Sequence, residues 1–149
     1  MNKRWILNAA LFLAVIALAI FTLSNNEVDT IESKRITVSD LKLSTFNEIN
    51  IYFPSRATTS FILGDYGWKM NKPYNARADE LYVYRILALL ATTSSVKLKA
   101  ENLDKFGLDN PALRVVFSNN SLKEEFIFGT YNPVTEDQYI LYLGNIFLV

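Results

Sequence analysis

The chain has 149 residues with 15 basic and 15 acidic side chains, half of its residues are hydrophobic, and it contains no histidine and no cysteine. This composition excludes imidazole general bases, thiol nucleophiles, disulfides and the usual zinc sites. The lysines and arginines are scattered along the chain, so we expect no cationic surface for nucleic acid.

The first predicted element is an apolar run over residues 5–23 that contains no charged side chain. As a helix it would be about 28 Å long, close to the ~30 Å hydrocarbon thickness of a bilayer. We therefore predict a transmembrane signal-anchor helix over residues 5–23. Lys3 and Arg4 precede the run, and the first charge after it is Glu27, so the positive-inside rule predicts a cytoplasmic N-terminus over residues 1–4. The protein is then a single-pass protein of the cytoplasmic (inner) membrane, with the rest of the chain extracytoplasmic.

A cleaved signal peptide is the alternative interpretation, because it shares the basic start and the apolar run. Cleavage would release a free soluble protein. The run is longer than the usual signal core of about 7 to 15 residues, and the small-x-small triplet Ala17-Leu18-Ala19 lies inside it. Both facts favour the anchor.

Residues 24–35 are polar and show no apolar period, which is typical of a linker. Residues 36–149 follow as the predicted exported domain. The part after residue 24 has 125 residues, enough for one ordinary domain, and its 13 basic and 15 acidic side chains have a net charge of −2. Without cysteines, this domain depends on its apolar core for stability.

Alternation of apolar and polar residues predicts strands at the start of the domain. Ile49, Ile51 and Phe53 share one side of a predicted strand over residues 47–53, and residues 59–63 supply its partner after a turn at 54–58. A second turn at residues 64–67 leads into a short strand that contains Trp68 and ends at Pro73.

One strong helix is predicted outside the anchor, from a cap at Asp79 to about Ala91. At 100° per residue, its apolar stripe consists of Tyr82, Val83, Ile86, Leu87 and Leu90. We expect this stripe to cover the domain's own sheet; a docking face for a partner helix is the alternative.

The pattern of the C-terminal half predicts further strands and one helical turn. The turn is expected within residues 103–111, closed at Gly107, where a positive φ is easily adopted. The other expected segments are a short strand at 96–99, strands at 113–117 and 122–128, a loop at 129–136, and a hairpin of 138–143 with 146–149 that turns at Gly144-Asn145. The predicted fold class is α+β: a mostly antiparallel sheet covered by one main helix.

The order of several motif residues resembles the domain-of-unknown-function 4340 family over residues 36–149, and FGLDNP at residues 106–111 is the most specific part. The family-motif residues with an implied structural role are Trp68, Pro73, Asp79, Gly107, Leu108, Pro111, Gly129 and Tyr139. The resemblance implies one N-terminal span and an exported α+β domain, often encoded beside ABC-transporter components of the auxiliary type. It implies no established activity.

The candidate catalytic groups are three pairs of adjacent acids: Asp79-Glu80, Glu124-Glu125 and Glu136-Asp137. Neighbours in a strand point to opposite faces, so Glu124 and Glu125 are not expected to converge. A helix cap and solvated faces account for the three pairs, and no serine lies in a G-x-S-x-G or S-x-x-K motif. We therefore predict a protein that is not an enzyme, with no catalytic residue, no cofactor and no metal ligand.

Aromatic residues supply the remaining candidates. Trp68, Tyr74 and Tyr131 are proposed for contact with a partner or ligand, because aromatic side chains bury a large area and have polar edges. Core packing is the competing role for Trp68 and Tyr82, whereas Tyr74 and Tyr131 are expected at the surface. Two functions follow: an accessory subunit of an ABC-transporter-like envelope complex with a membrane-protein partner, or a tethered binding module for an envelope glycan, lipid or peptide.

Overall fold

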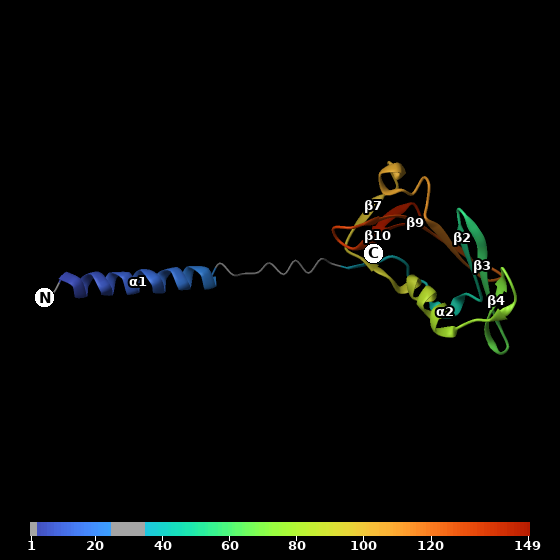
Figure 1. The fold of residues 1–149 in the computed structure, drawn as a ribbon, viewed down its shortest axis with the longest axis horizontal. Coiled ribbons are helices and arrows are strands. Elements are labelled where there is room, and N and C mark those ends of the chain that lie inside the picture. Colours follow the sequence, from blue (N-terminus) through green and yellow to red (C-terminus); the bar gives the residue numbers. More distant parts are fainter. Residues whose placement is uncertain (1–2, 25–34) are drawn as a thin grey trace. The chain divides into compact units, whose positions relative to one another are not determined.

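The computed structural model describes residues 3–24 and 35–149, which belong to two separate compact units. The first unit contains α1, Lys3–Ser24, a helix of 22 residues (Figure 1). It includes the predicted span over residues 5–23, and large apolar side chains are exposed on it, among them Trp5, Leu11, Phe12, Leu13 and Phe21. In the part of the chain that the structure describes, no helix combines the length and the apolarity that a membrane span requires. The anchor therefore stays a prediction, and the predicted linker lies outside the described residues apart from its two end positions.

The second unit is built on a nine-stranded sheet in the order β5-β4-β3-β2-β8-β9-β10-β11-β7. Every neighbouring pair is antiparallel. The strands are β2 Glu48–Phe53, β3 Arg56–Gly64, β4 Gly67–Lys72, β5 Ala76–Arg77, β7 Lys97–Lys99, β8 Leu113–Ser118, β9 Lys123–Asn132, β10 Asp137–Tyr142 and β11 Asn145–Leu148. A separate two-stranded sheet pairs β1, Ile36–Thr37, with β6, Thr93–Ser94. The predicted α+β class with an antiparallel sheet is confirmed.

The main helix of this unit is α2, Glu80–Leu87, which continues as the 3₁₀ turn η2, Ala88–Ala91. The Asp79 side chain caps it by accepting a hydrogen bond from the Leu81 amide at 2.9 Å, as predicted. The sheet is strongly curved, and α2 lies on its concave side (Figure 1). Two shorter turns are η1, Leu43–Thr45, and η3, Leu103–Phe106.

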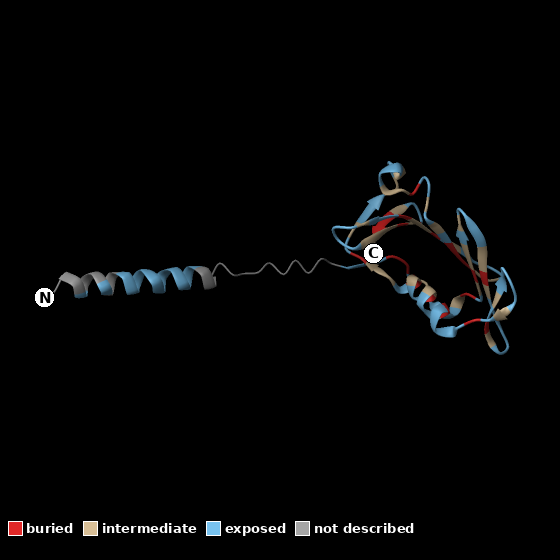
Figure 2. Cartoon of the chain, viewed as in Figure 1, coloured by how far each residue is buried: buried red, intermediate tan, exposed pale blue. Residues whose placement is uncertain are grey.

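The core lies between the concave face of the sheet and α2, where buried segments of both face each other (Figure 2). Val83, Leu87 and Leu90 are the buried helical residues, as their stripe predicted. Tyr82 was expected in the same stripe, but it is 63% exposed. It lies one residue before Val83, about 100° around the helix, and the Arg85 guanidinium lies 5.8 Å from the centre of its ring.

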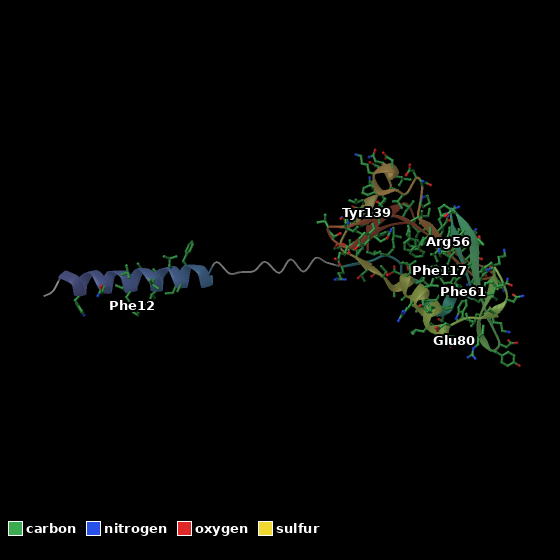
Figure 3. All side chains as sticks on the ribbon, viewed as in Figure 1. Phe12, Arg56, Phe61, Glu80, Phe117 and Tyr139 are labelled. Carbon is green, nitrogen blue, oxygen red and sulfur yellow. The ribbon has the colours of Figure 1, made fainter. Side chains whose placement is uncertain are left out.

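A row of aromatic rings forms the centre of the core. Phe117, which is fully buried and is labelled in Figure 3, has its ring centroid 5.8 Å from that of Phe46 and 5.7 Å from that of Phe126. Phe126 in turn stacks on Tyr142 at 4.3 Å. These contacts join η1, β8, β9 and β10 in one apolar layer.

Three predicted boundaries are wrong. Strand β3 begins at Arg56, so the preceding turn is shorter than residues 54–58. Strand β9 continues through Gly129 to Asn132, where its last residue pairs with Asp137, so most of the predicted loop at 129–136 is strand or tight turn. Tyr142 pairs with Asn145, which places the last turn at Leu143-Gly144, both with positive φ, and not at Gly144-Asn145.

Candidate functional site

An apolar groove opens between α2–η2 and the middle of the sheet, with a cavity volume of about 410 Å³. Eight of its ten lining residues are apolar, and none is acidic. The lining consists of Ile51, Phe53, Arg85, Ile86, Ala88, Leu89, Thr92, Leu113, Val115 and Phe128.

The groove exists because the sheet extends beyond the helix that covers it. On β2, Ile49 is fully buried, whereas Ile51 and Phe53 on the same side of the strand are half-buried. Ile51 pairs with Val115 on β8, so the uncovered apolar surface continues onto the next strand. Apolar side chains that would complete the core are therefore open to a ligand or partner.

Two arginines lie at this apolar surface. Arg85 is an exposed lining residue, and the Arg56 guanidinium lies 4.4 Å from the centre of the Phe53 ring. Among residues 3–24 and 35–149, an ion pair joins Arg114 to Glu125 at 3.6 Å. Neither Arg85 nor Arg56 has a carboxylate partner among these described residues. Arg56 is labelled in Figure 3 near the β2–β3 hairpin.

A smaller opening of about 300 Å³ lies along another side of α2. Its lining includes Leu43, Phe46, Leu63, Trp68, Tyr84 and Leu87. Trp68 is 4% exposed, so its ring belongs to the core and presents almost no surface. Trp68 is therefore a packing residue and a poor candidate for the predicted surface contact.

The other two contact candidates are exposed as expected, Tyr74 by 65% and Tyr131 by 53%. The structure does not bring Trp68 and Tyr131 together. Trp68 on β4 and Tyr131 on β9 have three strands between them, which corresponds to about 19 Å at the usual strand spacing. None of the three lines the apolar groove. Trp68 and Tyr131 therefore do not share one contact surface, and contact through Tyr74 or Tyr131 stays a prediction.

The family-motif residues meet where η3 packs on β9. Gly107 closes η3 with φ 63°, as predicted, and the Thr130 hydroxyl donates to the Phe106 carbonyl at 3.1 Å. A Cβ atom at Gly129 would lie 2.0 Å from the Phe106 carbonyl oxygen, so only glycine allows this close approach. Leu108 is buried beside it.

The remaining motif residues also have structural positions. The Tyr139 ring contacts the Phe106 ring edge-on at 4.9 Å, near the place where Figure 3 labels Tyr139. Pro111 precedes Ala112, whose amide donates to the Phe128 carbonyl at 2.8 Å, and Pro73 directly follows β4. Asp79 caps α2. None of these residues lines the groove.

The geometry of strand β9 holds the two side chains of the Glu124-Glu125 pair apart. The Glu124 carboxylate accepts a hydrogen bond from the Tyr142 hydroxyl at 3.1 Å, while Glu125 pairs with Arg114 on the neighbouring strand. Burial and the contact with Glu124 raise the pKa of Tyr142 to about 12. Among the described residues, no three acidic side chains gather to hold a metal ion.

Comparison with known proteins identifies the family. Residues 68–149, more than half of the chain, match the family model described as a domain of unknown function, DUF4340. The chain belongs to this family. The match begins at Trp68 and contains every motif residue described above, whereas the resemblance predicted a match from residue 36. No curated protein and no solved structure matches the chain.

Sequence reasoning missed the groove residues as a site. Ile51, Phe53 and Phe128 were assigned to strands and Ile86 to the covered stripe, which is correct for their secondary structure. The sequence signal that could have indicated the groove is the length of the apolar face of β2. This face continues to the last residue of the strand, beyond the part that a helix of two to three turns covers.

Proposed function

We propose that this member of the DUF4340 family is a membrane-anchored accessory subunit that acts through contact and catalyses no reaction. Its domain of residues 36–149 would bind a membrane-protein partner of the ABC-transporter-like class in the cell envelope. The observation that supports this proposal best is the groove of about 410 Å³, whose lining is apolar apart from Arg85 and Thr92. Such a lining offers contact area, as is typical of binding surfaces.

The anchor is supported by residues 5–23, an uninterrupted run without charge. The helix α1 that contains it has 22 residues, about 33 Å at 1.5 Å per residue. Its described side chains expose Leu11, Phe12 and Phe21, and a helix with apolar residues all round is typical of a membrane span. Lys3 and Arg4 favour a cytoplasmic N-terminus and an extracytoplasmic domain.

Affinity purification tests the proposal. The full chain, tagged at its C-terminus and extracted in a mild detergent, should recover a membrane complex. Replacing Ala88, an exposed groove residue, by glutamate should abolish this recovery, because a bulky charge would occupy the apolar surface. Val134→Glu is the matched control, since Val134 is 88% exposed and lies outside the groove. Recovery of the chain alone in every case would contradict the proposal.

The anchor has its own test. Alkaline extraction of membranes should leave the chain in the pellet, and its intact mass should include residues 1–24. A mature chain that begins near Asn25 would mean that the apolar run is a cleaved signal peptide.

A tethered binding module is the second candidate function, and the groove volume favours it because small-ligand pockets usually measure about 300 to 1,000 Å³. The ligand would bind in the groove, and Trp68, Tyr74 and Tyr131 lie outside its lining. The double variant Tyr74→Ala, Tyr131→Ala should therefore keep both the melting temperature and the binding of the wild-type chain. A loss of binding with unchanged stability would restore the aromatic residues as the contact site.

A further inference from the structure

We propose that the groove of about 410 Å³ binds one acyl chain of an anionic phospholipid, with Arg85 and Arg56 beside its phosphate. This inference deepens the second candidate function, the tethered binding module, and rests on the membrane anchor of the proposed function. Three features of the domain lead to it: the size of the groove, the charges around it, and the place where the chain enters the domain.

The size and the lining of the groove suit an acyl chain. Its volume of about 410 Å³ lies within the ~300 to 1,000 Å³ that is typical of small-ligand pockets. An unbranched acyl chain is narrow, and the aliphatic and phenyl side chains of the lining would bury it.

The charges favour an anionic head group. Arg85 lines the groove, the Arg56 guanidinium lies over Phe53, and no acidic residue is part of the lining. Both guanidinium groups lack a carboxylate partner within the described part of the chain. Residues 36–149 contain 11 basic and 12 acidic side chains, a net charge of −1, so two arginines without acidic neighbours in the lining differ from the domain's average. A phosphate at the rim would complement it, because guanidinium binds phosphate oxygens in a bidentate geometry.

The path of the chain favours a lipid as the source of that acyl chain. The Val38 amide donates to the carbonyl of Thr92 at 2.9 Å, and Thr92 lines the groove. Val38 follows Arg35, the first described residue of the domain, by three positions, and β1 pairs with β6 directly after Thr92. The described domain therefore begins beside the groove. The proposed anchor would tether this domain to a membrane, whose lipids carry acyl chains.

Photocrosslinking of the full chain in phosphatidylcholine vesicles tests this inference. A phosphatidylglycerol with a photoactivatable diazirine in its acyl chain is included as a minor component, and the matched phosphatidylcholine probe is used in parallel. Mass spectrometry of the digested protein should locate the phosphatidylglycerol label at Ile51, Phe53 and the segment 86–92. The phosphatidylcholine probe should label the same residues several-fold less.

Arg85→Gln should lower labelling of the groove by the phosphatidylglycerol probe about fivefold, the loss expected for one contact between exposed charges. Lys97→Gln is the matched control, because Lys97 is an exposed cation on the edge strand β7, outside the groove, and its removal should change nothing. In a Trp5→Phe background, fluorescence of the buried Trp68 confirms that each variant is folded.

Several results would overturn the inference. Labels spread over the exposed surface, or equal labelling by the two head groups, would show that the groove does not select an anionic lipid. Crosslinks from the groove to another polypeptide or to a second copy of this chain would identify a protein as the occupant. An anchored chain that recovers its partner but carries no label in the groove would refute this inference alone. Release of the chain on alkaline extraction would refute the membrane anchor of the proposed function, and this inference with it.

Discussion

Replacing Gly129 by alanine should destabilise the domain strongly, because the added Cβ atom has no space. It would lie 2.0 Å from the Phe106 carbonyl oxygen and 3.0 Å from Cγ of Leu108. Over-packing in a core usually costs about 1 to 3 kcal/mol. The nearest atom here belongs to the backbone of η3 and cannot rotate away, so we expect a loss near the upper end, about 3 kcal/mol. For a domain of this size the melting temperature should fall by about 12 °C.

Gly64→Ala is the matched control. Gly64 is also a strand residue, but its added Cβ would lie 3.9 Å from the nearest atom, the Gly67 carbonyl oxygen. The same chemical change should therefore shift the stability by no more than about 0.5 kcal/mol. Comparing the two variants separates the effect of the close approach at Gly129 from the general effect of alanine on a strand.

Urea unfolding of the full chain in mild detergent measures both effects. Trp5→Phe leaves Trp68 as the only tryptophan, and Trp68 is buried in the domain core, so its fluorescence reports on the domain alone. With a slope of about 2 kcal/mol/M, the midpoint of the Gly129 variant should fall by about 1.5 M. A Gly129 variant within about 0.3 M of the parent protein, or an equal loss in the Gly64 variant, would refute the packing of η3 against β9 as the reason for this glycine.

Three further predictions concern single contacts. Tyr142, whose pKa is raised to about 12, should titrate well above the ordinary value of 10.0 when tyrosinate absorbance is followed. Its contribution to stability should be complete below pH 10 and should be lost as the pH rises through about 12, because the folded state resists deprotonation of this tyrosine. Glu124→Gln should lower the pKa of Tyr142, and an unchanged titration in this variant would contradict Glu124 as a cause of the raised pKa. Asp79→Ala should lower the free energy of unfolding by about 1 kcal/mol through loss of the helix cap, and no change in the urea midpoint would show that the cap is dispensable. Ser94→Ala should lower the free energy of unfolding by about 2 kcal/mol, because the buried Ser94 hydroxyl accepts hydrogen bonds from the Leu148 amide at 3.0 Å and from the Val96 amide at 3.1 Å. The same change at the exposed Ser95 should leave the melting temperature unchanged.

Local patterns predicted the secondary structure of the domain well where the signal lies within a few residues. The alternation of Ile49, Ile51 and Phe53 gave strand β2, and Asp79 before an apolar stripe gave the start of α2. Gly107 at the end of η3 has the expected positive φ. In each case the cause is the backbone geometry of a strand, a helix or a turn, which neighbouring residues determine by themselves.

The errors arose where distant segments decide the outcome. The glycine and polar residues after Phe128 indicated a loop, but Gly129 is a strand residue that allows η3 to approach. Tyr82 belongs to the helical stripe by its spacing, yet the sheet covers only the sector that holds Val83 and Leu87. Whether such a residue is buried or exposed depends on which other segment packs against it. The spacing of residues along one segment does not contain that information.

The sequence by itself determined the α+β class, the helix cap, the motif that marks the family, and the apolar run that predicts an anchor. Each of these features depends on residues that are close together in the chain. The tertiary structure alone decided that Trp68 is buried, that Tyr131 lies several strands away from it, and that Phe53 and Arg85 line one groove. The physical reason is the curvature of the sheet and the short length of α2: together they decide which apolar residues are covered and which remain open for binding.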